Sequence, residues 1–267
     1  MPFPMCSLHQ LGWRSCYAHG LTLADFEVGY PARVVTVRHD RLSVLSSRGP
    51  GTTRWPLRPV GAIAGGVAAG DWLLLEQRSG CVLRLLARQS LLGGALAANL
   101  DTLFVVTACG GDFSVARLQR YLALAFEARV TPVVVMTKAD RCVDAPAWLA
   151  TAQRLLPDAR VLLVNVDERG SAARLEPWLA EGSTVALVGP AGAGKDNLMR
   201  HWLDDAADAP AGRGAPAGPA GMPPSMRPLR TGAWVIDTPG LRGLCDVMAM
   251  PSGGGASSRV VSRGARR

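Results

Sequence analysis

Residues 184–197 read Thr-Val-Ala-Leu-Val-Gly-Pro-Ala-Gly-Ala-Gly-Lys-Asp-Asn, and this stretch decides the fold. Its first five residues, through Val188, are the apolar run of a buried β-strand. The next seven, Gly189 to Lys195, have the GxxxxGK spacing of a phosphate-binding loop. Glycines let backbone N–H groups surround phosphate oxygens, and the N-terminus of a following helix adds positive potential. The stretch therefore predicts a strand, a phosphate-binding loop and a helix in an α/β fold.

Lysine usage supports a nucleotide site. Only two of the 29 lysines and arginines are lysines, and both lie in candidate nucleotide-binding motifs, as Lys138 and Lys195. A compact ammonium fits between phosphate oxygens where a planar guanidinium does not. We expect Lys195 to bridge the β- and γ-phosphates. The candidate phosphate-binding residues are Gly189, Pro190, Ala191, Gly192, Ala193, Gly194, Lys195, Asp196 and Asn197.

Asp196 occupies the position where a phosphate-binding loop usually carries Ser or Thr, whose hydroxyl binds Mg²⁺. A carboxylate can contact the metal, but it also lies beside the phosphate charges. Like charges a few ångströms apart repel each other. Asp196 is therefore predicted to weaken the binding of nucleotide and Mg²⁺.

A second motif, Thr137-Lys138-Ala139-Asp140, follows the apolar run of residues 132–136. It is similar to the guanine-reading NKxD motif, with Thr in place of Asn. In this interpretation Asp140 accepts hydrogen bonds from guanine N1 and N2, and the Lys138 stem packs over the base. The alternative is an ordinary turn at the end of a strand.

Two further motifs follow apolar runs. Asn165 and Val166 form a candidate second guanine loop, for which a plain turn is the alternative. Asp237-Thr238-Pro239-Gly240 has the DxxG pattern, in which the aspartate holds Mg²⁺ and the glycine N–H meets the γ-phosphate. A Pro-Gly turn is the alternative there. Asp237 and Gly240 are thus the candidate Mg²⁺ and γ-phosphate residues.

The composition indicates a globular protein with an acidic partner. The 267-residue chain is 48% hydrophobic and has a formal net charge of +8. Such a charge favours nucleic acid as partner, although an arginine-rich genome would give the same bias. The arginines expected to contact RNA are Arg33, Arg38, Arg41, Arg54, Arg58, Arg259, Arg263, Arg266 and Arg267.

The six cysteines are scattered singly, without a CxxC motif or a Cys/His cluster of zinc spacing. Reduced thiols in a cytoplasmic protein are the simplest interpretation. The N-terminal residues lack the apolar core of a signal peptide, and no apolar run reaches transmembrane length. We therefore expect a cytoplasmic protein that does not contact a membrane.

The pattern of apolar residues divides the chain. Residues 31–92 read as short strands with Gly turns, which favours an OB-type β-barrel that binds RNA. Residues 98–250 alternate strand and helix patterns, as in a doubly wound α/β domain. Residues 1–30 are predicted to be an N-terminal extension. The Pro/Gly/Ala-rich residues 206–226 are predicted to be a mobile loop without a core element, and residues 251–267 a disordered basic tail.

The order of the motifs is unusual. A regular GTPase runs P-loop, DxxG and then NKxD, whereas here the guanine motif comes first, followed by the P-loop and DxxG. This order indicates a circular permutation. A small β-barrel followed by a permuted G domain resembles the ribosome small-subunit-dependent GTPase A (RsgA) family. Residues 98–101, Asp112-Phe113, and the following Arg117, Arg120 and Tyr121-Leu122 are also similar to that family, and the resemblance spans roughly residues 30–245.

The resemblance implies a cofactor, a reaction and a partner. It implies binding of GTP with Mg²⁺, and GTP hydrolysis stimulated by the 30S ribosomal subunit during its late maturation. It also implies that the barrel binds 16S rRNA, and we expect a monomer. Leu241 follows the DxxG motif, where the family carries an apolar residue instead of a water-orienting glutamine, so intrinsic hydrolysis should be slow.

Three departures from the family motivate alternatives. Asp196 replaces the Mg²⁺-binding hydroxyl, and residues 206–226 replace the switch threonines. The family's Cys/His zinc domain is not expected in this chain, so neither is zinc. One alternative is a degenerate homologue that binds nucleotide or RNA without hydrolysis. Another is a truncated product that folds poorly.

Overall fold

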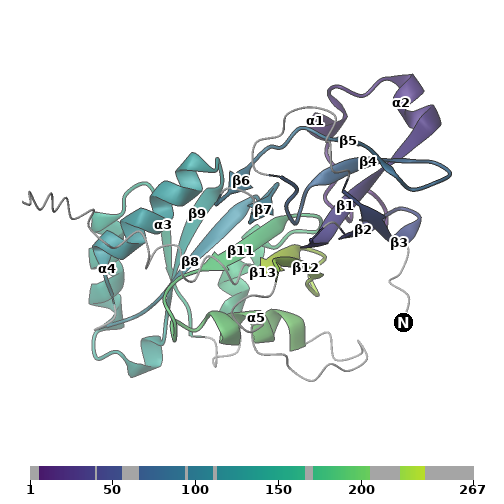
Figure 1. Ribbon diagram of the computed structural model, residues 1–267. Helices are drawn as coiled ribbons and strands as arrows, with labels where there is room; N and C mark the ends of the chain where they lie inside the picture. The colour runs from purple at the N-terminus through teal and green to yellow at the C-terminus, as the bar shows by residue number, and fades with distance from the viewer. Residues whose placement is uncertain are drawn as a thin grey trace, which may run out of the picture.

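The computed structural model describes residues 6–39, 41–55, 66–93, 96–110, 113–165, 171–204 and 223–237. Figure 1 shows the arrangement of its elements. The helices are α1 (Ser15–Ala18), α2 (Leu23–Val28), α3 (Val115–Glu127), α4 (Ala145–Leu155) and α5 (Lys195–Asp204), with 3₁₀ turns η1 (Ala139–Arg141) and η2 (Ala172–Trp178). The strands are β1 (Gly29–Arg38), β2 (Arg41–Ser46), β3 (Gly49–Arg54), β4 (Trp72–Glu76), β5 (Val82–Leu85), β6 (Leu91–Leu92), β7 (Ala97–Ala98), β8 (Thr102–Ala108), β9 (Thr131–Thr137), β10 (Arg160–Leu163), β11 (Thr184–Val188), β12 (Ser225–Pro228) and β13 (Trp234–Asp237).

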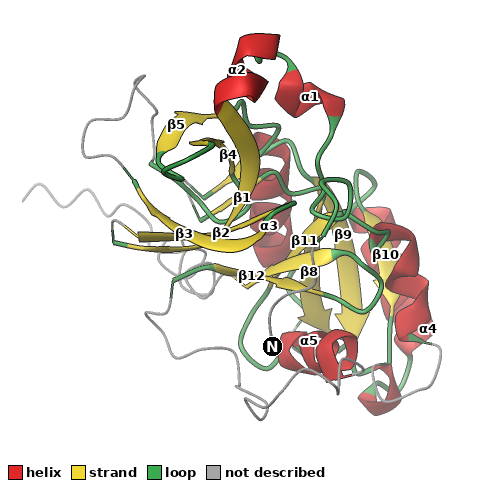
Figure 2. Cartoon of the chain, turned by 90° about the vertical axis from the view of Figure 1, so that its right-hand side faces the viewer, coloured by secondary structure: helices red, strands yellow, loops and turns green. Residues whose placement is uncertain are grey.

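Strands β1 to β5 form an antiparallel OB-type barrel at one end of the molecule (Figure 2). A hairpin joins β1 and β2, which run antiparallel with Arg38 paired to Arg41. β1 is long enough to pair with β4 as well, and β4 continues the sheet to β5. Apolar side chains from three strands fill the interior; these are Ala32, Val34, Leu42, Val44, Leu73 and Leu75.

The second part of the chain is a doubly wound sheet in the order β10-β9-β8-β11-β13-β12. The first five of these strands run parallel to one another, and β12 runs antiparallel to β13. Because their carboxyl ends meet at one edge, the loops after β9, β11 and β13 share that edge. The alternating pattern of residues 98–250 therefore predicted the fold class correctly.

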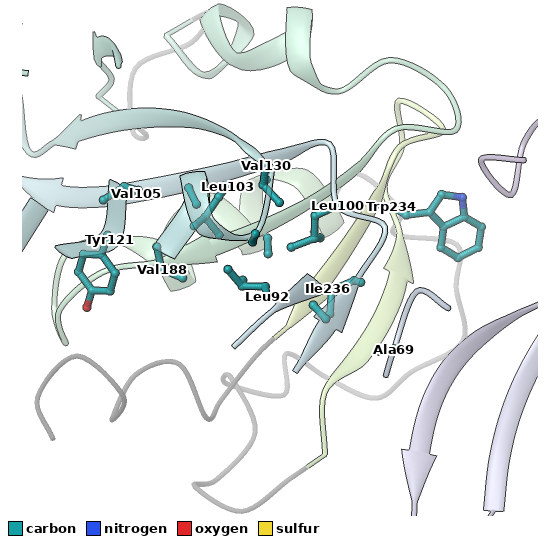
Figure 3. Close-up of a cluster of buried hydrophobic side chains, with 14 of the residues drawn as sticks. Ala69, Leu92, Leu100, Leu103, Val105, Tyr121, Val130, Val188, Trp234 and Ile236 are labelled. Atoms are coloured by element: carbon teal, nitrogen blue, oxygen red, sulfur yellow. The ribbon is translucent and has the colours of Figure 1, made fainter. Parts of the chain in front are cut away.

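Both faces of the parallel sheet are covered, as the uninterrupted apolar runs of its strands require. On β8, Leu103 and Val105 lie in the core beneath α3, which Ser114 caps by accepting a hydrogen bond from the Arg117 N–H. Figure 3 shows this core, in which Tyr121 of α3 lies near Val105. Phe104 and Val106 alternate to the opposite face, and that face is covered by α5 and η2.

The expectation that residues 206–226 contain no core element is wrong for the last two residues of the segment. Residues 225–228 form strand β12, and Met226 is buried in the core with 3% of its surface exposed. A strand forms here because β12 lies between β13 and β1. Ser225 and Met226 pair with Asp237 and Ile236 of β13, and Ser225 also lies opposite Thr36 of β1. Residues 206–222 of the segment lie outside the described residues.

Arg33 corrects a second expectation, since this arginine is not on the barrel surface. The residue is 1% exposed, and its guanidinium donates hydrogen bonds to the carbonyl of Leu11 and, at 2.7 Å, to the hydroxyl of Thr184. The Gly70 and Asn99 carbonyls accept from it at 3.4 Å. Arg33 thus joins the N-terminal segment, the barrel, the short connection between β7 and β8, and the first residue of β11.

Burial lowers the pKa of the Arg33 guanidinium to about 10, so the group stays charged at neutral pH. The face of Trp72 lies 5.6 Å from the guanidinium carbon and adds a favourable cation–π contact. Across this junction the carboxylate of Asp101 accepts from the Thr184 N–H at 2.8 Å and pairs with Arg14 at 2.7 Å. The junction between barrel and sheet is therefore polar, buried and hydrogen-bonded.

No helix in the described part of the chain is long and apolar enough to cross a membrane.

We predict that Arg33→Met lowers the free energy of unfolding by about 1–3 kcal/mol, because buried acceptors such as the Thr184 hydroxyl lose their donor. Methionine keeps an apolar stem of similar length. Arg38→Met on the exposed end of β1 is the matched control and should change stability by less than about 0.5 kcal/mol. Urea unfolding of the two variants measures the difference, and equal midpoints would contradict the role given to Arg33.

Candidate functional site

The loop after β11 has the shape of a phosphate-binding loop. β11 is buried along its whole length, and α5 begins at Lys195, six residues after Gly189. Gly189 has a φ of 143°, and a Cβ at this position would overlap the Val106 carbonyl oxygen of β8. Only glycine permits this approach. The predicted strand, loop and helix are thus present in that order.

Lys195 folds back over the loop. Its ammonium donates to the carbonyl oxygens of Gly189 at 2.7 Å and Pro190 at 2.6 Å, and the residue is 8% exposed. The ammonium therefore lies over the backbone of the loop, next to the N-terminus of α5. This position concentrates positive charge where the loop would hold phosphate.

Asp196 and Asn197 lie in the first turn of α5, and both are exposed. An aspartate in this turn stabilises the helix through its dipole. The same carboxylate adds negative charge beside the phosphate loop. The Asn197 side-chain oxygen accepts from Arg200 at 3.2 Å. The geometry places both residues at the loop, and their roles toward a nucleotide remain predictions.

The guanine motif begins at the carboxyl end of β9. Lys138 has a left-handed backbone with φ 59°, and the chain then turns through η1. Asp140 lies in η1 with its carboxylate 40% exposed and 3.6 Å from the Arg141 guanidinium. The motif thus presents an accessible carboxylate on a tight turn at the sheet edge.

A hydrogen bond connects the guanine motif to the phosphate loop. The hydroxyl of Thr137, a residue only 1% exposed, lies 2.6 Å from the Ala193 carbonyl and 3.3 Å from the Thr107 carbonyl. A hydroxyl has one proton, so the shorter contact is the principal bond. Thr137 replaces the Asn of the NKxD pattern, and its side chain holds the two loops together. The sequence offered no signal for this partner.

Two other predicted loops lie at the same edge. The Asn165 N–H donates to the Ser171 hydroxyl at 2.8 Å, directly after Val164, whose N–H bonds to Met136 of β9. Asp237 ends β13, which runs parallel to β11 with Ile236 opposite Ala186. Val166 and Gly240 lie outside the described residues.

The amino-acid sequence of the chain is similar to those of known proteins. A family model described as RsgA GTPase matches residues 78–245. The small ribosomal subunit biogenesis GTPase RsgA of Mesorhizobium japonicum is 40% identical over 253 residues, covering 89% of this chain and 72% of the relative. The chain belongs to the RsgA GTPase family. A second relative, small ribosomal subunit biogenesis GTPase RsgA 2 of Vibrio vulnificus, is 34% identical over 254 residues, with coverage of 89% and 70%.

Solved structures support the fold. YjeQ from Thermotoga maritima superposes with a TM-score of 0.62 at 18% identity, covering 79% of this chain and 75% of that chain. YloQ, described as a circularly permuted GTPase, gives a TM-score of 0.58 at 18% identity, with coverage of 79% and 71%. The prediction of an RsgA-type fold, a barrel followed by a permuted GTPase domain, is confirmed.

We predict that Thr137→Val weakens the binding of fluorescently labelled GDP by about tenfold or more, because it removes the Ala193 bond and leaves a buried carbonyl without a donor. Thr137→Ser keeps the hydroxyl and should bind nearly as tightly as the wild type. Fluorescence titration of both variants separates loss of the bond from a general packing defect. Equal affinity of the Val and wild-type proteins would show that the bond does not position the loops.

Proposed function

We propose that the chain binds and hydrolyses GTP and acts in late maturation of the small (30S) ribosomal subunit, with hydrolysis stimulated by that subunit. The observation that carries this proposal is the Thr137–Ala193 hydrogen bond, which joins the guanine motif to the phosphate loop at the edge of the sheet that both share. Family membership supports it, because the RsgA relatives are named as small ribosomal subunit biogenesis GTPases.

The residues divide into two ends of one nucleotide site. At the phosphate end, the N–H groups of the loop, the ammonium of Lys195 and the N-terminus of α5 would contact the β- and γ-phosphates. At the base end, Asp140 would accept from guanine and the Lys138 stem would pack over the ring. Asn165, with Val166, would line the same end of the base.

Mg²⁺ would be held by the Asp237 carboxylate, because hard cations prefer oxygen ligands. Asp196 stands where the usual hydroxyl ligand would be, and its negative charge beside the phosphates would weaken the binding of Mg²⁺·GTP. When bound, Mg²⁺ would neutralise charge that develops on the phosphates during transfer. Asp196 would also repel the γ-phosphate, which supports slow turnover until the ribosomal subunit completes the site. Leu241, an apolar residue where other GTPases orient water, points to the same control.

The barrel is the candidate surface for 16S rRNA. OB-type barrels are common scaffolds for nucleic-acid binding. Arg38, Arg41 and Arg54 are exposed on β1, β2 and β3 and would contact RNA phosphates, whereas Arg33 is buried. We expect the protein to act as a cytoplasmic monomer on the subunit.

A second candidate function is a homologue that binds nucleotide or RNA without hydrolysing GTP. The placement of Asp196 in the first turn of α5, directly beside the phosphate loop, favours it. The two functions differ in one observable, which is phosphate release in the presence of 30S subunits.

We predict that Asp196→Ser strengthens binding of Mg²⁺·GTP by about tenfold, since removing a like charge beside the phosphates is worth at least about 1.4 kcal/mol. Wild-type phosphate release should be slow alone and faster with 30S subunits, and the variant should exceed it in both conditions. Asp158→Ser removes an exposed carboxylate far from the loop and is the matched control.

The outcomes separate the two functions. If the wild type binds GTP but releases no phosphate, even with 30S subunits, the result favours the non-hydrolysing homologue. Turnover that Asp196→Ser leaves unchanged would contradict the role given to this carboxylate. Lys195→Ala should abolish binding, and retained affinity in that variant would place the nucleotide elsewhere.

A further inference from the structure

Two cysteines lie beside the guanine motif without any role in the proposed nucleotide site. Cys109 is the first residue after β8, and its N–H donates to the Thr137 carbonyl at 2.8 Å. Cys142 is the first residue after η1, and its N–H donates to the Ala139 carbonyl at 3.2 Å. The two thiols, which are 33 positions apart in the sequence, therefore come from the end of β8 and from the turn that contains Asp140.

The two side chains are direct neighbours. The thiols of Cys109 and Cys142 are close enough to interact, and the Cys142 sulfur lies 3.9 Å from where a Cβ on Gly110, the residue after Cys109, would be. Both cysteines are half-buried, so small reagents can reach them. Burial, together with the neighbouring Cys142 thiol, raises the pKa of Cys109 to about 12 and keeps that thiol protonated.

We propose that Cys109 and Cys142 form a reversible disulfide in the presence of a hydroperoxide, and that this disulfide distorts the guanine loop. The second part rests on the proposed function, because it presupposes that the loop reads guanine. Disulfides in reducing compartments are usually transient and redox-sensing, which suits a pair of adjacent free thiols.

The chemistry requires only the two thiols and the peroxide. Cys142, which follows η1, attacks the peroxide oxygen as its thiolate and becomes a sulfenic acid. The leaving group is an alcohol, or water when the oxidant is hydrogen peroxide. The protonated Cys109 thiol then condenses with the sulfenic acid: its sulfur bonds to the sulfenic sulfur, and its proton leaves with the sulfenic hydroxyl as water. The two thiols are oxidised by two electrons, and the peroxide O–O bond is reduced.

The new bond would move the loop. An S–S bond is about 2.05 Å long, well below the separation of two thiols that are not covalently bonded. Because Cys109 directly follows the buried central strand β8, we expect the turn that carries Cys142 to move toward it. Asp140 precedes Cys142 by two residues and would move with that turn. Because the bond is covalent, a thiol reductant would restore the original position.

The test begins with mapping the disulfide in the full chain. Trypsin should place Cys109 in the peptide 89–117 and Cys142 in the peptide 142–154, so the cross-link joins two peptides of known mass. After treatment with about one equivalent of hydrogen peroxide, we expect this linked pair, and dithiothreitol should remove it. Cys142→Ser and Cys142→Ala should both lack it, and Cys81→Ser on the barrel should retain it. Oxidation without this pair, or cysteines linked at random, would overturn the proposal.

The effect on the loop is measured on the same samples with labelled GDP. We expect oxidation to weaken binding by about tenfold, as displacement of one charged hydrogen-bond acceptor implies, and reduction to restore it. Oxidised Cys142→Ser should bind as before. If the cross-linked wild type binds GDP as tightly as the reduced protein, the claim that the disulfide distorts the guanine loop is overturned. Absence of GDP binding in reduced protein would instead contradict the proposed function and, with it, the guanine-loop part of this inference, while the mapped cross-link would still stand.

Discussion

The hydrogen bond from the Thr137 hydroxyl to the Ala193 carbonyl joins two loops that are 56 residues apart, and the proposed nucleotide site depends on it. It can form because β8 lies between β9 and β11 in a parallel sheet, so that both loops leave the same edge. Gly189 completes the arrangement by lying against the Val106 carbonyl of β8. The site is thus defined by which strands are neighbours, and the order of the motifs along the chain can be permuted without changing it.

The barrel is fixed to this sheet at the far end of β11. Arg33 reaches from β1 to Thr184, where β11 begins, and the phosphate loop follows its last residue, Val188. At about 3.3 Å per residue, these two ends are roughly 13 Å apart. The buried guanidinium, together with the pairing of β1 with β12, therefore holds the barrel against the sheet. The pair Cys109 and Cys142 lies instead at the loop end of β8, beside the base.

Local patterns were sufficient for much of the fold and of the candidate site. The strand before Gly189 and the turn at Lys138 each follow from a few adjacent residues. The structure corrects the sequence analysis where distant segments decide the outcome. Arg33 is buried because the Leu11 carbonyl and the Thr184 hydroxyl close over it, and β1 alone gives no sign of either. Met226 lies in a strand because its segment pairs with the distant strand β13. The Pro/Gly/Ala-rich sequence before it had favoured the prediction of a loop.

The most direct test of the account is the nucleotide preference of Asp140→Asn. The Asp140 carboxylate should accept from guanine N1 and N2, while an asparagine amide can donate to the carbonyl that xanthine carries in place of the guanine amine. Competition titration against labelled nucleotide should therefore show that the wild type prefers GDP to xanthosine diphosphate and that the variant reverses this order. Equal GDP affinity of the two proteins would contradict the claim that this permuted loop reads guanine.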